Sequence, residues 1–208
     1  MTMRKLLKER NIDWLLHFTR AENLPNILKY GLLPLCDLET KGIDVQINDQ
    51  YRYDGCEDAI CLSVEFPNYK MFYRLRQEDT RVKWVVLLLN ANLICDLECA
   101  FCHDNAGSAK VYNIPLNERM DVRAFEKMFD ELPYGPTREK LGIGNWYPTS
   151  PQAEILVFDK VPISYFHSIF FNNNDTLNEY IEIIPQGIKA KVYSRAFSYR
   201  KDWEYWRG

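Results

Sequence analysis

The run VKWVVLLL at residues 82–89 constrains the fold of this 208-residue chain most strongly, because it is almost continuously apolar and rich in β-branched side chains. Such a run predicts a central strand of a sheet. Similar patterns predict further strands at residues 14–18, 59–64, 153–158 and 188–193.

Apolar residues spaced three or four positions apart predict short helices at residues 21–30, 68–77, 121–132 and 176–183. The predicted strands and helices do not alternate as regular βαβ units. We therefore expect the α+β class, with a twisted mixed sheet rather than a doubly wound parallel one.

The composition predicts one domain over residues 1–208, because 47% of the residues are hydrophobic and 14% are aromatic. The net charge of −3 disfavours a broadly basic surface that coats duplex nucleic acid, so any nucleic-acid contact is expected to be local. Residues 1–10 are basic but lack a signal-peptide pattern, and no later run is long and apolar enough for a membrane span. We expect a cytoplasmic protein with reduced cysteines and no membrane partner.

The segment CDLECAFCH offers Cys95, Cys99, Cys102 and His103, and it contains the Cys-x-x-Cys-His pattern of covalent haem attachment. One hypothesis is therefore a non-catalytic module that binds a metal or haem. Zinc sites usually draw paired ligands from two separated segments, and buried free cysteine is common. The favoured interpretation is that these thiols are structural and that the protein binds no metal.

A histidine ends the apolar run that precedes a predicted helix in HFTRAENLPNIL, residues 17–28. Thr19 and Glu22 fit a capping box, and Gly31 stands where a left-handed residue ends a helix. His17 would then lie near backbone amides that suit a phosphate group. The alternative is a core histidine hydrogen-bonded to a carbonyl.

Two common nucleotide-binding motifs are missing from the sequence. GIGNWY, which begins at Gly142, lacks the third glycine of a dinucleotide-binding fingerprint and follows no predicted strand. The lysine motif of phosphate-binding loops is also absent, which argues against the usual kinases and ATPases.

Four segments together resemble the DarT family of DNA ADP-ribosyltransferase toxins. They are HFTRAENLPNILKYGLLP (residues 17–34), FPNYKMFYRLR (66–76), FCHDNAGSAK (101–110) and PQAEILVFDKVPISYF (151–166). They follow one another in the family's order, and the resemblance covers residues 14 to 166.

The resemblance implies an ADP-ribosyltransferase fold with two facing twisted sheets and NAD bound between them as a co-substrate. It implies transfer of ADP-ribose from NAD to a base, guanine or thymine, in single-stranded DNA, by the toxin of a toxin–antitoxin system. The sequence of residues 66–73, FPNYKMFY, is more similar to the branch of the family that modifies guanine. It also implies an antitoxin partner that reverses the modification, commonly a macrodomain hydrolase. An ADP-ribosyltransferase that acts on protein or RNA shares the NAD site and stays open.

Glu154 matches the family's catalytic glutamate and begins a predicted strand after the turn-rich segment 132–152, which we expect to face the substrate. Cleavage of the nicotinamide–ribose bond builds positive charge on the sugar, and a nearby carboxylate stabilises such a state. Arg52 is the best match to the family's arginine. Its guanidinium would clamp the NAD diphosphate or orient the acceptor base, so it counts as both a catalytic and a cofactor-binding candidate. With this resemblance, His17, Thr19 and Asn23 would contact the adenosine side of NAD.

The helix predicted at residues 68–77 alternates aromatic rings with positive charges, which is the combination that binds single strands by stacking and phosphate contact. The alternative is an ordinary amphipathic helix with Met71, Phe72 and Leu75 buried. Asn105 and Ser108 are suggested by the resemblance as contacts to base edges. The DNA-binding candidates on the helix are Tyr69, Lys70, Phe72, Tyr73, Arg74 and Arg76.

Overall fold

The computed structural model describes residues 1–46, 58–133 and 135–207. Its strands pair in the order β4-β5-β2-β1-β3-β6-β7. Neighbouring strands are antiparallel except β6 and β7, which are parallel. The strands are β1 (Trp14–Arg20), β2 (Ile60–Val64), β3 (Trp84–Asn90), β4 (Cys99–Cys102), β5 (Glu154–Val157), β6 (Phe166–Phe171) and β7 (Lys189–Val192).

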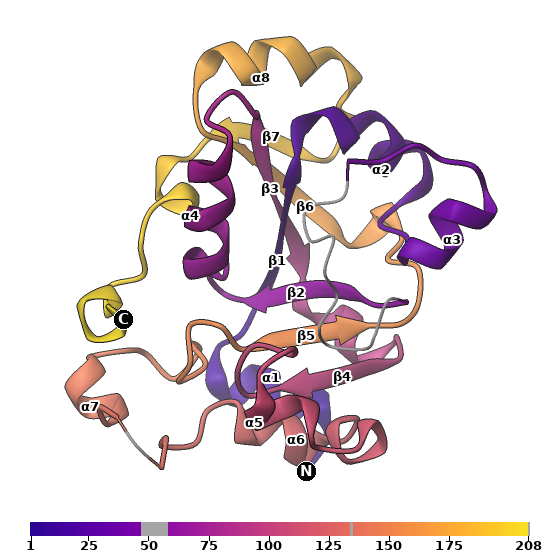
Figure 1. Cartoon of the computed structure of the whole chain (residues 1–208). Helices are drawn as coiled ribbons and strands as arrows, with labels where there is room; N and C mark the ends of the chain where they lie inside the picture. The colour runs from indigo at the N-terminus through magenta and orange to yellow at the C-terminus, as the bar shows by residue number, and fades with distance from the viewer. Residues whose placement is uncertain (47–57, 134, 208) are drawn as a thin grey trace.

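The sheet has two halves that meet where β1 pairs with β2. β1 and β3 pair along their whole length, whereas β1 and β2 share only the pairs Leu15↔Val64 and Leu16↔Ser63. In Figure 1, β1 and β3 run steeply while β2, β5 and β4 run across them. The expected mixed sheet is confirmed. In place of the two expected facing sheets, all seven strands belong to one hydrogen-bonded sheet.

Short helices surround the sheet, with α4 and the C-terminal segment on one side and α2 and α3 on the other (Figure 1). The α-helices are α1 (Met3–Arg10), α2 (Leu24–Tyr30), α3 (Leu35–Thr40), α4 (Tyr69–Glu78), α5 (Ala109–Tyr112), α6 (Val122–Lys127), α7 (Arg138–Leu141) and α8 (Asn174–Tyr180). The 3₁₀ turns are η1 (Ala21–Asn23), η2 (Ala91–Cys95), η3 (Leu116–Arg119), η4 (Ile163–Tyr165), η5 (Ile181–Ile183), η6 (Ser194–Phe197) and η7 (Trp203–Trp206). None of the helices in the described ranges is both long and apolar enough to cross a bilayer.

The strand β3 is buried on both faces, as the run at 82–89 predicts. Val85 and Leu87 belong to the main core, whereas Trp84 and Val86 pack in a second cluster with Phe72 of α4. Since successive side chains of a strand alternate between faces, a continuous apolar run fits a strand covered on both sides. The C-terminal segment contributes to the second cluster through Ala196 and Phe197.

The five predicted strands correspond to β1, β2, β3, β5 and β7, with ends that agree to within two residues. The short strands β4 and β6 were not predicted, nor was α1. The predicted helix at 121–132 is too long, because the amide of Met128 bonds to the Phe125 carbonyl and the chain tightens after Lys127.

The predicted capping box is wrong. Thr19 lies within β1, and its hydroxyl accepts a bond from the side chain of Asn23 at 3.0 Å instead of capping a helix. The α-helix starts only at Leu24, after the turn η1. The predicted end at Gly31 is confirmed, because Gly31 has φ +81° and a Cβ there would lie 2.5 Å from the carbonyl oxygen of Val161.

The cysteines of the segment 95–103 do not converge on one point. Cys99 packs in the main core, whereas Cys102 packs in a third cluster with Ala100 and Leu156 on the other face of β4. Burial is the main cause that raises the pKa of the Cys99 thiol to about 12, so this group stays protonated at neutral pH. This geometry favours the structural interpretation of the thiols over a shared metal or haem site.

Candidate active site

A pocket of about 240 Å³ opens between β1, β2, α2 and the first residues of α4 and β5. Most of its wall is apolar, including Leu16, Ile27 and Leu62. A few polar side chains enter this wall, which is the usual construction of a small-molecule site. The polar side chains are His17, Thr19, Asn23, Asn26, Tyr30, Gln46, Ser63, Asn68, Asn105 and Glu154.

Glu154 is the first residue of β5 and is only 6% exposed. Its Oε1 atom accepts hydrogen bonds from the side-chain amides of Asn68 at 3.1 Å and Asn105 at 3.0 Å. Its Oε2 atom accepts a longer bond, 3.4 Å, from the backbone amide of Ala106. The carboxylate is therefore held in one orientation at the pocket wall by donors from two separate loops.

Asn68 is a site residue that the sequence patterns did not single out. Its Oδ1 atom accepts from the amide of Met71 and so caps α4, while its backbone amide donates to the hydroxyl of Ser63. These bonds fix the side chain so that its amide nitrogen donates to Glu154. An asparagine directly before a helix is a capping signal that could have drawn attention to this position.

The side-chain amide of Asn105 donates to Glu154, and the predicted contact of this residue with a DNA base edge stays a prediction. Its Oδ1 atom accepts from the amide of Gly107, which closes a tight turn. Asp104 anchors the same turn by accepting from the hydroxyl of Ser150 at 3.0 Å and from Lys110 at 3.1 Å. The hydroxyl of Ser108, the other predicted base contact, is buried and has no hydrogen-bond partner within the described ranges.

His17 bonds to a carbonyl, as the core-histidine alternative expects, and it also lines the pocket, while its contact with NAD stays a prediction. Its Nδ1 atom lies 2.9 Å from the carbonyl oxygen of Cys61, and a carbonyl only accepts, so Nδ1 carries the hydrogen. Burial lowers the pKa of the imidazole, and the bond to Cys61 opposes this only in part. The neutral ring therefore offers Nε2 as an acceptor.

Thr19 and Asn23 also line the pocket, but their polar atoms are engaged within the chain. The amide nitrogen of Asn23 donates to Thr19 and to the carbonyl of Gln46, and its oxygen accepts from the amide of Gln46. Asn23 thus fixes the backbone at Gln46 as part of the pocket wall. Arg52, the candidate arginine, lies outside the described residues.

The predicted DNA-binding residues of α4 separate into an inner and an outer group. Tyr69 is 5% exposed, and its ring meets Tyr199 edge to face. Arg76 donates to the carbonyl of Phe197 at 2.7 Å and lies over the ring of Phe72. These inner residues hold the C-terminal segment against α4, and the burial of Phe72 and Leu75 agrees with an amphipathic helix.

The outer group comprises Lys70, Tyr73 and Arg74. Tyr73 is 42% exposed, and Arg74 forms a surface ion pair with Glu78. Such exposed pairs contribute little to stability and are easily exchanged for other partners. Tyr73 and Arg74 are exposed, whereas Lys70 is half-buried like Arg76.

Comparison with solved structures finds related chains of low sequence identity. Thermosipho africanus DarTG in complex with ADP-ribose superposes with a TM-score of 0.63 at 15% identity, over 89% of this chain and 51% of that one. Thermus sp. 2.9 DarT in complex with NAD+ gives 0.55 at 14% identity, over 89% and 98%. The same protein in complex with ADP-ribosylated ssDNA gives 0.62 at 13% identity, over 90% and 97%.

These likenesses support the fold, and the chain spans about half the length of the Thermosipho africanus chain. A sequence comparison with curated proteins finds no match. The family model described as "ssDNA thymidine ADP-ribosyltransferase, DarT" matches residues 16–203, which is most of the chain and includes the pocket, Asn68, Asn105 and Glu154. The family expected from the four sequence segments is therefore confirmed: the chain belongs to the DarT family.

Proposed function

We propose that this protein transfers ADP-ribose from NAD+ to a base in single-stranded DNA, with Glu154 as the catalytic carboxylate. The observation that carries the proposal is the buried Glu154 carboxylate, which three donors orient at the wall of the pocket in a chain that belongs to the DarT family. The solved relatives include DarT complexes with NAD+ and with ADP-ribosylated ssDNA.

In the proposed reaction, the bond between the ribose C1′ and the nicotinamide nitrogen breaks, and nicotinamide leaves with the electron pair. The ribose becomes positively charged, and the fixed carboxylate of Glu154 stabilises that charge. A nitrogen of the acceptor base then bonds to C1′ and loses a proton, which Glu154 is placed to accept. Because Asn68 and Asn105 already hold the carboxylate, little reorganisation is needed at the transition state.

The pocket suits NAD+ as a co-substrate. Its apolar wall can cover a base, and the neutral His17 presents an acceptor for a ribose hydroxyl. We place the adenosine side of NAD near His17, Thr19 and Asn23, and the nicotinamide ribose near Glu154. Arg52 is retained as the candidate for the diphosphate or the acceptor base.

We place the DNA strand along the outer side of α4 and the adjacent C-terminal segment, which lie side by side in Figure 1. Apart from the buried pair Arg200 and Asp202, residues 69–78 and 194–207 carry six basic and two acidic side chains, although the whole chain has a net charge of −3. Tyr73 contacts Tyr199, which stacks on Trp203, so aromatic rings accompany the charge. Positive charge with exposed rings is the combination that single strands bind.

Thymine is the first base to test, because the matching family model specifies thymidine. Guanine is the second base to test, because the sequence of residues 66–73 resembles the branch of the family that modifies guanine. We further propose that the protein acts in the cytoplasm as a toxin. Its proposed partner is an antitoxin with ADP-ribosyl hydrolase activity on a macrodomain, in keeping with the DarTG relative.

The test is incubation of the purified protein with NAD+ and short oligonucleotides that differ only in containing thymine or guanine, analysed by mass spectrometry. We expect a mass increase of one ADP-ribose on one oligonucleotide type, and none with Glu154→Gln. Modification of added RNA or protein, with unmodified DNA, would contradict the proposed acceptor and leave the NAD site in place.

A further inference from the structure

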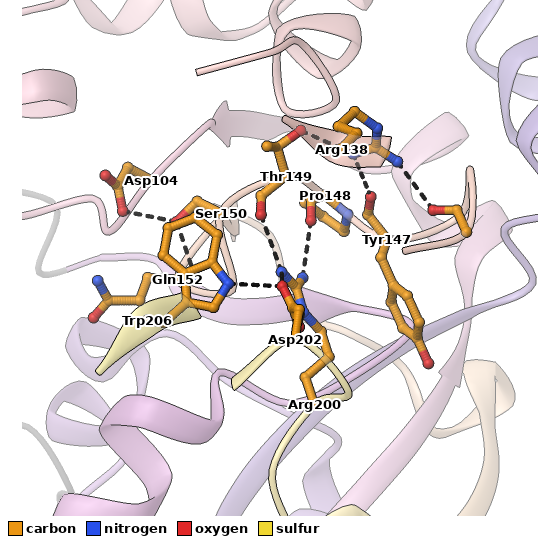
Figure 2. Close-up of polar contacts among 11 residues, drawn as sticks. Asp104, Arg138, Tyr147, Pro148, Thr149, Ser150, Gln152, Arg200, Asp202 and Trp206 are labelled. Carbon is orange, nitrogen blue, oxygen red and sulfur yellow. Dashed lines mark hydrogen bonds and ion pairs between the residues drawn. The ribbon is translucent and has the colours of Figure 1, made fainter. Parts of the chain in front are cut away.

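The segment 142–152, which leads into Glu154, is held in place by arginines that lie outside it. Arg200 reaches it from the C-terminal segment, and Arg138 reaches it from α7. Figure 2 shows both guanidinium groups directed at backbone carbonyls of this segment. The segment is irregular over most of its length, so its own backbone makes few of the bonds that would define its shape.

Arg200 is 3% exposed, and its guanidinium donates to two kinds of acceptor, backbone carbonyls and a carboxylate. It donates to the carbonyls of Pro148 at 2.8 Å and Thr149 at 3.0 Å. It also forms a two-point ion pair with Asp202, with bonds of 2.7 and 2.6 Å. Trp206 donates from its indole to the same carboxylate at 2.7 Å.

A buried ion pair of this kind is weak support for a role in stability alone. Removing two charges from water costs free energy, and their mutual attraction often does no more than offset this cost. A protein with an apolar pair of similar size is therefore frequently as stable. What an apolar pair cannot supply is the directed contact between the guanidinium and the two carbonyls. The bonds to Pro148 and Thr149 are therefore the feature that distinguishes Arg200 from a hydrophobic substitute.

Arg138 makes the second set of contacts to the same segment. It donates to the carbonyls of Tyr147 at 2.9 Å and Gly144 at 3.0 Å, and to the hydroxyl of Thr149 at 2.8 Å. Thr149 is thus held through its carbonyl by one arginine and through its side chain by the other.

The held segment is connected to the carboxylate by a short series of hydrogen bonds. Ser150 follows Thr149 and donates to Asp104, which also accepts from the backbone amide of Asn105. Asn105 in turn donates to Glu154. Displacement of residues 147–150 would therefore move both the start of β5 and the turn that orients its catalytic carboxylate.

We propose that the buried Arg200–Asp202 pair is a positioning device, which fixes residues 147–150 and through them the geometry of Glu154. This inference rests on the proposed function. Within the described ranges, Arg200 is not a pocket residue and donates to carbonyls and to Asp202 rather than to Glu154, so it is a positioning residue that acts through the segment and Asn105. The C-terminal segment thereby takes part in catalysis as well as packing against α4.

The experiment replaces the pair with apolar side chains, Arg200→Met together with Asp202→Leu, to remove the directed bonds without leaving a buried charge. We expect a folded protein with near wild-type melting temperature and NAD+ affinity. We expect kcat for transfer to DNA to fall about 10- to 100-fold, the range for a misplaced catalytic group. KM for the oligonucleotide should change little.

The matched control is Arg81→Met together with Asp79→Leu, because these residues form a two-point pair with the same spacing on the surface. It should keep wild-type kcat. If the Arg200/Asp202 variant does not fold, Arg200→Lys provides the same measurement, because lysine keeps the charge beside Asp202 but lacks the planar fork that reaches both carbonyls. A folded variant of either kind that transfers at wild-type kcat overturns the inference, whereas a wild-type protein that modifies no DNA overturns the proposed function instead.

Discussion

The side-chain amide of Asn68 donates to Oε1 of Glu154 at 3.1 Å, although the two residues are 86 positions apart in the chain. The same side chain caps α4 through its oxygen. One residue therefore joins the start of the helix proposed to face DNA to the carboxylate proposed to act on NAD.

Glu154→Gln should reduce transfer of ADP-ribose by roughly 10²–10³-fold or more, because the charge that stabilises the ribosyl cation is lost. The glutamine oxygen can still accept from Asn68 and Asn105, so the fold and NAD+ binding should persist. Only the backbone amide of Ala106, which donates the long bond to Oε2, would lose its acceptor, because glutamine has an NH₂ group at that position. Transfer rates and NAD+ affinity, measured on the same preparation, test this, and a near wild-type rate would remove Glu154 from the mechanism.

Asn105→Ala distinguishes a residue that orients Glu154 from one that contacts DNA. We expect slower transfer and also slower hydrolysis of NAD+ by water in the absence of DNA, by about 10-fold, since misplaced catalytic groups cost this much or more. Both rates are measured with saturating NAD+. Loss of DNA transfer with unchanged hydrolysis would return Asn105 to the base-contact role expected from the sequence.

His17→Phe keeps an aromatic ring in the pocket but removes both nitrogens. We expect NAD+ affinity to fall by about 0.5–1.5 kcal/mol, a few-fold to tenfold, which is the usual effect of one lost hydrogen bond. Calorimetric titration with NAD+ at pH 7.5 measures it. Unchanged affinity in the folded variant would show that the histidine serves only the bond to Cys61.

Lys70→Ala together with Arg74→Ala should weaken binding of single-stranded oligonucleotides and flatten its dependence on salt. Each lost phosphate contact lowers the slope of log K against log salt by about 0.7 for single strands. The charge-matched control is Lys5→Ala with Lys189→Ala, at exposed positions of α1 and β7. Equal slopes for the two variants would exclude this side of α4 as the DNA surface.

Glu65→Gln tests a pH dependence of stability. Burial raises the pKa of Glu65 above its ordinary value of 4.5, and the amides of Asp13 and Trp14 that donate to it oppose the shift only partly. The folded state therefore binds this proton more tightly than the unfolded state does. The resulting stabilisation of the fold is fully present below pH 4.5 and is lost as the pH rises through the raised pKa.

Thermal melts of both proteins between pH 4 and 8 provide the measurement. The wild type should lose stability relative to Glu65→Gln as the pH rises across this range. Glu9→Gln, at an exposed position of α1, is the control. A stability difference between wild type and Glu65→Gln that is the same at every pH would show that burial does not control this carboxyl.

The sequence by itself determined the features that depend on residues close together in the chain. Apolar runs and periodicity predicted β3 as a central strand and α4 as an amphipathic helix, and the glycine at Gly31 predicted the end of α2. Local patterns suffice here because strand and helix preferences act over a few residues. The family resemblance also selected Glu154, which lies in the pocket wall.

Only the tertiary structure decided which distant groups meet at that residue. The order β4-β5-β2 places the ends of three strands together, and this brings Asn68 and Asn105 to one carboxylate. It also decided that Arg76 holds the C-terminal segment and that Arg200 holds the segment before β5. In the sequence, neither arginine can be distinguished from a solvent-exposed basic residue. Hydrogen bonds across such separations depend on how strands pair and which loops pack together, and no local pattern encodes that geometry.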